Sequence, residues 1–264
     1  MTPSTIPPRR ACRLSSAAPP RLAALLALTA LSLSCATWRA PAVPLRTIEL
    51  APRSGGSCLA VLLPGRWDEP ERFRRAGFAA AVAQRGLQLD LVAVDAHLGY
   101  YRDRSVVERL RADVVAPARA AGYREIWLVG ISLGGLGGLT YLREHPEDLA
   151  GVLALAPYLG EAELVREIEA AGGAASWRPQ RSGDGASPGR ELWSWLAPWA
   201  AESGGPPLHL AWGEQDELAR ASRLLAALLP GERLYAQAGG HDWKTWQRLW
   251  EQFLDRTVLC RARP

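Results

Sequence analysis

The sequence predicts a single α/β domain built on a mostly parallel sheet, with helices on both faces of the sheet. Short apolar runs of strand length alternate with longer amphipathic runs from residue 58 onward. Such alternation favours right-handed crossovers between neighbouring parallel strands. The chain is long enough for this fold, because 264 residues, 48% of them hydrophobic, can bury a full core.

The N-terminal 34 residues are typical of an export signal. Arginines precede an apolar run at 22–33, and small residues surround Cys35. Residues 31–35 are similar to a bacterial lipobox, whose cysteine becomes the lipidated first residue, although Ser32 stands where the pattern prefers an aliphatic side chain. The expected organisation is a signal peptide at 1–34, a tether at 35–44 and the domain at 45–264.

This N-terminus predicts export to a bacterial cell envelope. Two forms are expected, a lipoprotein attached to the membrane through Cys35 and a periplasmic protein, and secretion is the alternative. Cleavage near Ala36 or Ala40 and an uncleaved anchor also stay open. Export makes disulfides permissible, so Cys58 and Cys260 are predicted either to form a bridge or to be two buried thiols.

The formal charge of +4 does not indicate a nucleic-acid partner. Four arginines and no acidic residue lie in the first 34 positions, and the remainder balances 27 basic against 27 acidic side chains. Because the domain has no net positive charge, its sequence lacks the electrostatic signature of a nucleic-acid-binding protein.

The first half of the domain combines an edge strand, two further strands and two amphipathic helices. The run at 58–63 is continuously apolar, as in a strand covered on both faces. Gly86 ends the first helix, and Pro117 interrupts or kinks the second. The expected elements are strands at 45–50, 58–63 and 87–94 and helices at 69–85 and 105–121.

The second half repeats this rhythm, except between residues 158 and 205. That segment has a charged helix at 161–171, a loop at 172–190 and a tryptophan-rich stretch at 192–200, and it predicts a small cap. Its tryptophans either pack the cap onto the body or line an apolar pocket. Around it we expect strands at 125–131, 149–156, 208–212 and 233–236, a helix directly after 131, and helices at 217–229 and 243–258.

A nucleophile elbow is indicated where the central strand ends in Gly130-Ile131-Ser132-Leu133-Gly134. In this G-x-S-x-G motif a serine occupies a strained strand-to-helix turn with its hydroxyl exposed above the sheet. The strain requires small residues two before and two after the serine. Ser132 is therefore the candidate nucleophile.

A serine needs a base, and His241 is the candidate among four histidines. His241 follows the last strand, on the edge of the sheet where parallel strands end and ligands bind. His209 lies inside a strand, His145 ends a helix, and His97 precedes the serine, where it is expected to shape a loop.

The orienting acid is expected after the penultimate strand, in Trp212-Gly213-Glu214-Gln215-Asp216. Asp216 is preferred because it lies beyond the turn, Glu214 is the second choice and Asp242 the third. Asp216 is also placed to cap the following helix, and the two roles are compatible.

The oxyanion that forms in acyl transfer needs two backbone N–H donors. Leu133, directly after the nucleophile, is expected to supply one of them. Arg66, after the 58–63 strand, is expected to supply the other, with Trp67 as the next choice.

These segments resemble the α/β-hydrolase family from about residue 58 to residue 258. The order Ser132, Asp216, His241 is the family's order, and Gly239-Gly240-His241-Asp242-Trp243 is similar to the histidine loop of esterase D-like and feruloyl-esterase-like members. The family commonly has His-Gly at the oxyanion loop, where this chain has Pro64-Gly65.

The resemblance implies a serine hydrolase that cleaves small carboxylic esters through an acyl-enzyme, without cofactor or metal. Thioesterases, lipases and peptidases use the same groups and stay open as alternatives. A different class is an envelope lipoprotein that keeps the fold as a non-catalytic binding scaffold.

Overall fold

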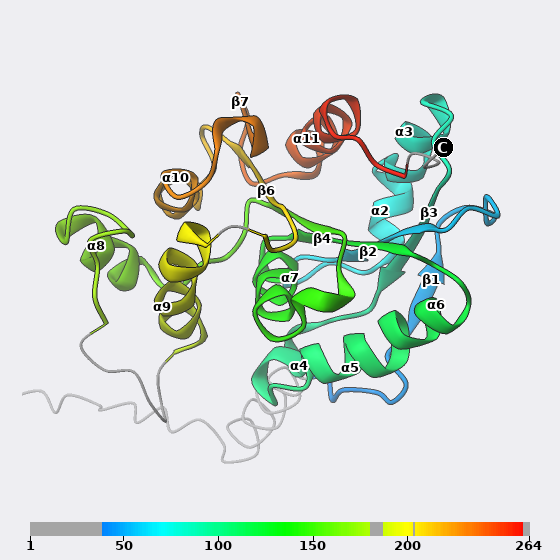
Figure 1. The fold of residues 1–264 in the computed structure, drawn as a ribbon, viewed down its shortest axis with the longest axis horizontal. Helices are drawn as coiled ribbons and strands as arrows, with labels where there is room; N and C mark the ends of the chain where they lie inside the picture. Colours follow the sequence, from blue (N-terminus) through cyan, green and yellow to red (C-terminus); the bar gives the residue numbers. More distant parts are fainter. Residues whose placement is uncertain (1–38, 180–186, 203, 261–264) are drawn as a thin grey trace, which may run out of the picture. The chain divides into compact units, whose positions relative to one another are not determined.

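A seven-stranded sheet forms the centre of the described chain (Figure 1). The computed structural model describes residues 39–179, 187–202 and 204–260, so the expected signal peptide and Cys35 lie outside the described residues. The chain divides into two units, 1–39 and 40–264, and all described elements belong to the second.

The strands follow the order β1-β3-β2-β4-β5-β6-β7, and every neighbouring pair except β1 with β3 is parallel. This confirms the predicted α/β fold, and the single antiparallel strand lies at the edge, as expected. The strands are β1 Thr47–Glu49, β2 Cys58–Leu63, β3 Leu89–Val94, β4 Glu125–Ile131, β5 Gly151–Leu155, β6 Leu208–Gly213 and β7 Leu234–Gln237.

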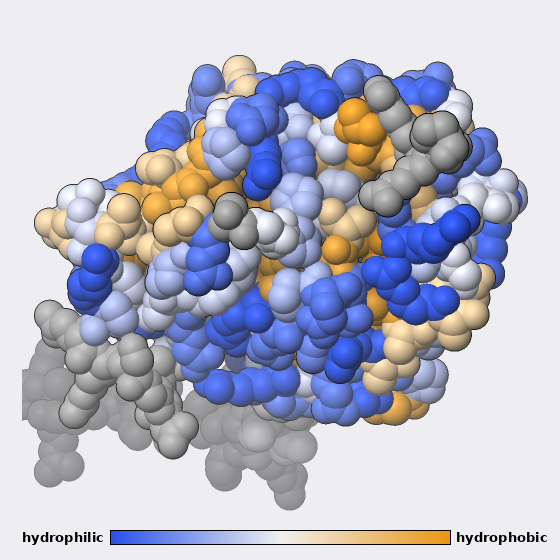
Figure 2. All heavy atoms as spheres, viewed as in Figure 1, coloured by the Kyte–Doolittle hydropathy of each residue, from blue (hydrophilic) through white to orange (hydrophobic). Residues whose placement is uncertain are grey.

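Helices cover both faces of the sheet, which explains why β2 is apolar throughout. All six residues of β2 are buried, and alternate side chains point to opposite faces. Leu59, Val61 and Leu63 belong to one hydrophobic cluster, and Cys58, Ala60 and Leu62 belong to the other. On the face shown in Figure 2, hydrophilic residues cover most of the surface, as expected for helices whose apolar sides face the sheet.

One face is covered by α2 Glu71–Arg75, α3 Phe78–Gln84 and α11 Trp243–Arg256. The sequence predicts a single helix at 69–85, and this is wrong because Gly77 adopts a φ of 80° and separates α2 from α3. The other face is covered by α5 Val106–Leu110, a π-helical turn at Arg111–Val115, α6 Ala116–Ala120, α7 Leu133–Glu144 and α10 Ala219–Ala226. The helices of the expected cap, α8 Ala162–Ala170 and α9 Pro188–Ala201, pack on α10 and α7 (Figure 1).

The π-helical turn directly before α6 is the interruption that Pro117 predicts. The short helix α4 Leu98–Arg102 has no counterpart in the expected elements. In the expected cap, α9 begins at Pro188, within the predicted loop, because Ser187 caps its N-terminus. Within the described ranges, no helix is long and apolar enough to cross a membrane.

The register of the sheet brings the carboxyl ends of the six parallel strands to one side of it. Leu63 pairs with Gly130, Ile131 with Leu155, and Gly213 with Gln237. The loops after β2, β4, β6 and β7 therefore emerge side by side, and these are the loops that carry the candidate site residues.

Candidate active site

Ser132 occupies a strained turn between β4 and α7. Its backbone has φ 52° and ψ −112°, a conformation that residues with a side chain rarely adopt. Three backbone hydrogen bonds hold it there: its N–H donates to Leu155 O at 2.9 Å, and its carbonyl accepts from Leu136 N at 3.2 Å and from Tyr158 N at 2.9 Å. This is the elbow geometry that the sequence predicts.

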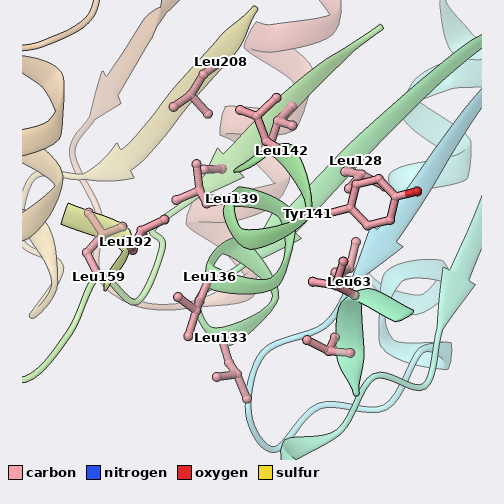
Figure 3. Packing of buried hydrophobic residues seen from close by; sticks show 14 of the residues in the cluster. Leu63, Leu128, Leu133, Leu136, Leu139, Tyr141, Leu142, Leu159, Leu192 and Leu208 are labelled. Carbon is pink, nitrogen blue, oxygen red and sulfur yellow. The ribbon is translucent and has the colours of Figure 1, made fainter. Parts of the chain in front are cut away.

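The glycines around Ser132 are required by close backbone approach. A Cβ on Gly130 would lie 2.1 Å from the carbonyl oxygen of Gly134, and a Cβ on Gly134 would lie 2.2 Å from that of Leu63. Both contacts are with backbone atoms, which cannot move aside as a side chain can. Figure 3 shows Leu133, Leu136 and Leu139 along α7, whose apolar side chains pack in the core beside this turn.

The structure brings Asp216 and His241 together. His241 Nδ1 lies 2.8 Å from Asp216 Oδ2 and 3.0 Å from Oδ1, and the Asp216 side chain is fully buried. Because a carboxylate can only accept, Nδ1 carries the proton and Nε2 is left free to act as a base. The His241 side chain is 22% exposed, so a substrate can reach it.

Asp216, and not Glu214 or Asp242, holds the imidazole. The Asp242 carboxylate instead accepts from Thr245 N at 2.9 Å and caps α11, and this backbone hydrogen bond is the main cause of its lowered pKa. Glu214 is exposed. Asp216 Oδ1 also accepts from Leu218 N at 2.8 Å, so the predicted helix-start contact exists beside the contact with His241.

Gln215 joins the loop after β6, which holds Asp216, to the loop after β7, which holds His241. The sequence does not predict this role. Its side-chain oxygen accepts from Gly239 N at 2.6 Å, and its own N–H donates to Gly239 O at 3.0 Å. Gly239 adopts a φ of 147°, which favours glycine. The only signal in the sequence was the position of Gln215 between the two acidic candidates.

The loop after β2 lies directly beside the elbow. Gly65 and Asp68 close a tight turn, with Asp68 N donating to Gly65 O at 3.2 Å. A Cβ on Gly65 would lie 3.8 Å from Ser132 Cβ, so the backbone of this turn approaches the candidate nucleophile. Arg66 is the first central residue of the turn, and its exposed side chain stacks on Trp67 at 4.6 Å.

Leu133 is the first residue of α7, on the other side of Ser132. The N–H groups of a helix's first turn have no acceptor within the helix and are available to an anion. The backbone N–H of Leu133 is therefore available beside the hydroxyl of Ser132. The candidate oxyanion donors, Leu133 and Arg66, come from segments that flank Ser132.

The other three histidines have structural positions. Burial lowers the pKa of His209 to about 4, and its ring packs against Trp127 and Phe253. His97 Nδ1 accepts from Gly99 N at 3.2 Å and caps α4, which confirms the expected loop role. His145 ends α7 and lies 3.4 Å from Glu147.

Among the described residues, two groups of side chains could hold a metal ion, and both lie near the amino ends of the strands, not at the elbow. One contains Cys58, Glu125 and Cys260, and the other contains His145, Glu147 and Asp148. In the first group, Cys58 and Cys260 are joined in a disulfide with a Cα–Cα distance of 5.5 Å. This bridge settles the alternative between a disulfide and two free thiols.

Residues 105–258, which contain Ser132, Asp216 and His241, match an esterase family model described as "Putative esterase". No curated protein sequence matches the chain.

Solved structures with a similar fold include hydrolases. Est1E from Butyrivibrio proteoclasticus, solved with ferulic acid, is 17% identical with a TM-score of 0.54, over 80% of this chain and 94% of that one. S-formylglutathione hydrolase (FrmB) from Staphylococcus aureus is 13% identical with a TM-score of 0.53, over 83% and 97% of the two chains. The enterobactin esterase FES from Shigella flexneri is 18% identical with a TM-score of 0.52, over 82% and 61%.

Proposed function

Because this chain belongs to the esterase family and is an α/β-hydrolase-fold serine hydrolase that cleaves carboxylic esters, we propose that Ser132, His241 and Asp216 are its catalytic triad. The observation that carries the proposal is the buried Asp216 carboxylate bonded to His241 Nδ1 at 2.8 Å, at the edge of the sheet where Ser132 is held with φ 52°.

In the proposed reaction, Ser132 Oγ attacks the ester carbonyl carbon while His241 Nε2 takes the hydroxyl proton. The carbonyl oxygen becomes an oxyanion, which accepts hydrogen bonds from the N–H groups of Leu133 and Arg66. Collapse of the tetrahedral intermediate expels the alcohol, to which His241 returns the proton. Water activated by His241 then hydrolyses the acyl-enzyme, and Asp216 stabilises the imidazolium in both steps.

Substitution of the nucleophile tests this assignment. Ser132→Ala is expected to lower hydrolysis of p-nitrophenyl esters by about 10³-fold or more. Ser222→Ala is the matched control, because Ser222 Oγ is buried on α10 and bonds to no other described residue. Wild-type turnover by Ser132→Ala would refute the assignment.

We propose a small-molecule carboxylic ester as the substrate. Burial and hydrogen bonds support a packing role for two of the four tryptophans of the cap. Trp193 is buried with its Nε1 donating to Leu159 O at 2.7 Å, and the buried Trp177 donates from Nε1 to Glu167 at 2.9 Å. A panel of esters and thioesters of increasing acyl length, given to purified residues 36–264, distinguishes an esterase from a thioesterase or a lipase.

We propose that the protein is exported and that Cys35 carries the lipid of a membrane anchor. The Cys58–Cys260 disulfide supports export, since such bridges persist in oxidising compartments. Palmitate labelling of cells is expected to mark the wild-type protein and to be lost in Cys35→Ala. Label that persists in this variant would exclude the anchor, and an intact disulfide would then fit a periplasmic or secreted protein.

A further inference from the structure

A long-range hydrogen bond joins the loop after β2 to the loop after β7. The oxyanion loop is residues 64–68, and the histidine loop is residues 239–243. Trp243 Nε1 donates to Asp68 Oδ1 at 3.0 Å across 175 positions of sequence. These are the loops that hold the proposed oxyanion donor Arg66 and the proposed base His241.

Asp68 contacts the oxyanion loop through both its backbone and its side chain. Its N–H donates to Gly65 O at 3.2 Å and closes the turn that presents the N–H of Arg66. Its second carboxylate oxygen, Oδ2, lies against Gly65, 2.9 Å from where a Cβ would be. The Asp68 carboxylate therefore packs against the backbone that approaches Ser132.

Trp243 is held by aromatic neighbours on both sides. Its ring meets Phe73 edge-on at 5.1 Å and Trp246 at 5.3 Å. The ring of Trp246 in turn packs edge-on against His241 at 4.9 Å. These contacts hold the indole of Trp243 in place relative to His241. The indole N–H in turn bonds to Asp68 of the oxyanion loop.

We propose that Asp68 and Trp243 are positioning residues that hold the oxyanion donor in register with the Ser132–His241 pair. The inference rests on the proposed triad. In this arrangement the Asp68–Trp243 bond sets where the Arg66 N–H lies when the oxyanion forms, so its loss affects the transition state more than the bound ester.

Three single substitutions separate the hydrogen bond from other properties of the pair. Trp243→Phe keeps an aromatic ring and removes the donor, Asp68→Ala removes the acceptor, and Asp68→Asn keeps an acceptor oxygen without the charge. We expect Trp243→Phe and Asp68→Ala each to lower kcat about 10- to 100-fold with little change in KM. Asp68→Asn is expected to stay within about threefold of wild type, because its amide oxygen still accepts the bond.

The double variant and an inhibitor test whether the two residues act as one unit. Asp68→Ala with Trp243→Phe is expected to lose no more activity than the worse single variant. Affinity for an aryl trifluoromethyl ketone, which forms an oxyanion on Ser132, is expected to fall in parallel with kcat. A purely structural role would lower the melting temperature without weakening this inhibitor.

Trp250→Phe is the matched control on the same helix. It also removes an indole hydrogen bond, from Trp250 Nε1 to Phe78 O at 3.2 Å, but one that does not touch the oxyanion loop. We expect a lower melting temperature with wild-type kcat. Wild-type kcat and inhibitor affinity in Trp243→Phe, or additive losses in the double variant, would overturn the inference.

The inference and the proposed triad fail in different ways. Inactive Ser132→Ala together with fully active Trp243→Phe would leave the triad standing and refute the positioning role. Active Ser132→Ala would refute the triad and, with it, the inference.

Discussion

The side of the sheet where the parallel strands end, the carboxyl edge, differs in construction from the side where they begin, the amino edge. At the carboxyl edge, Ser132 and Ala156 adopt positive φ angles of 52° and 44°, and the Asp216 carboxylate is bonded to His241. At the amino edge, the first residue of β2 is tied to Cys260 by a disulfide. A positive φ also occurs at the amino edge, since Cys260 itself has a φ of 55°. The two edges therefore differ in their side chains and cross-links: a hydrogen-bonded acid and histidine lie at one, and a covalent link stabilises the other.

Two histidines show the same contrast. His241, at the carboxyl edge, is partly exposed and bonded to a buried carboxylate. His209, near the amino end of β6, is 8% exposed and surrounded by aromatic rings, and burial lowers its pKa to about 4. The residue type alone does not determine function, because the carboxylate partner and the access to solvent decide which imidazole can serve as a base. Substitutions at the two edges should therefore separate activity from stability.

The largest expected effect is on activity, from Asp216→Asn. An amide in place of the carboxylate favours the wrong tautomer of His241, and kcat is expected to fall by about 10⁴-fold with little loss of stability. Steady-state kinetics and thermal unfolding measure the two effects. Asp242→Asn is the control in the same region, and because asparagine also caps helices its kcat should stay within about tenfold of wild type. Equal losses in both variants would contradict the assigned acid.

The largest expected effect on stability is at the amino edge, from loss of the disulfide. The bridge spans 202 positions, for which chain entropy implies about 5 kcal/mol of stabilisation. Replacement of Cys58 and Cys260 by serine is expected to lower the midpoint of denaturant unfolding strongly, while kcat of the folded enzyme is unchanged. A loss of kcat without a loss of stability would show that the two edges are not independent.

A smaller loss of stability, combined with a loss of activity, is expected at the elbow. Gly134→Ala would place a Cβ 2.2 Å from Leu63 O, and we expect it to cost about 3 kcal/mol or more and to displace Ser132. Gly138→Ala on the same helix meets Val152 at an ordinary 3.5 Å and should stabilise the protein by about 1 kcal/mol. Equal unfolding midpoints for the two variants would contradict the account of the turn.

The smallest expected effect is the pH dependence contributed by His209. Its lowered pKa of about 4 means that the folded state favours the neutral ring, so this stability is present above the unfolded value near 6.5 and is lost as pH falls toward 4. Between pH 8 and pH 5 the loss is about 2 kcal/mol. His209→Gln should remove this part of the pH dependence of unfolding. An unchanged pH profile in that variant would show that the ring does not titrate as its burial implies.

The sequence was sufficient to predict the features that depend on local patterns. Apolar runs located the strands, and G-x-S-x-G located the turn whose glycines the structure shows to be required. Asp216 and His241 each follow one of two neighbouring strands, which predicts that they meet, and the structure brings them within hydrogen-bond distance. Their catalytic role, like that of Arg66 and Leu133, stays a prediction.

Features that depend on tertiary contacts could not be predicted. The break between α2 and α3 follows from the positive φ of Gly77 alone. The proposed positioning role of Asp68 depends on a hydrogen bond with Trp243, which is 175 positions away in the sequence. No local pattern distinguishes Asp68 from other polar residues in loops. Trp243 stood beside the candidate base, but only the fold shows which loop its indole reaches.

Labelling with a fluorophosphonate tests the central claim most directly, since only an activated serine reacts with this class of probe. Intact mass spectrometry and peptide mapping of the purified protein are expected to show one adduct per chain, on Ser132. His241→Ala should slow its formation by about 10³-fold or more. Unreactive wild-type protein would favour a non-catalytic scaffold, and an adduct that forms at full rate in Ser132→Ala would contradict the proposed nucleophile.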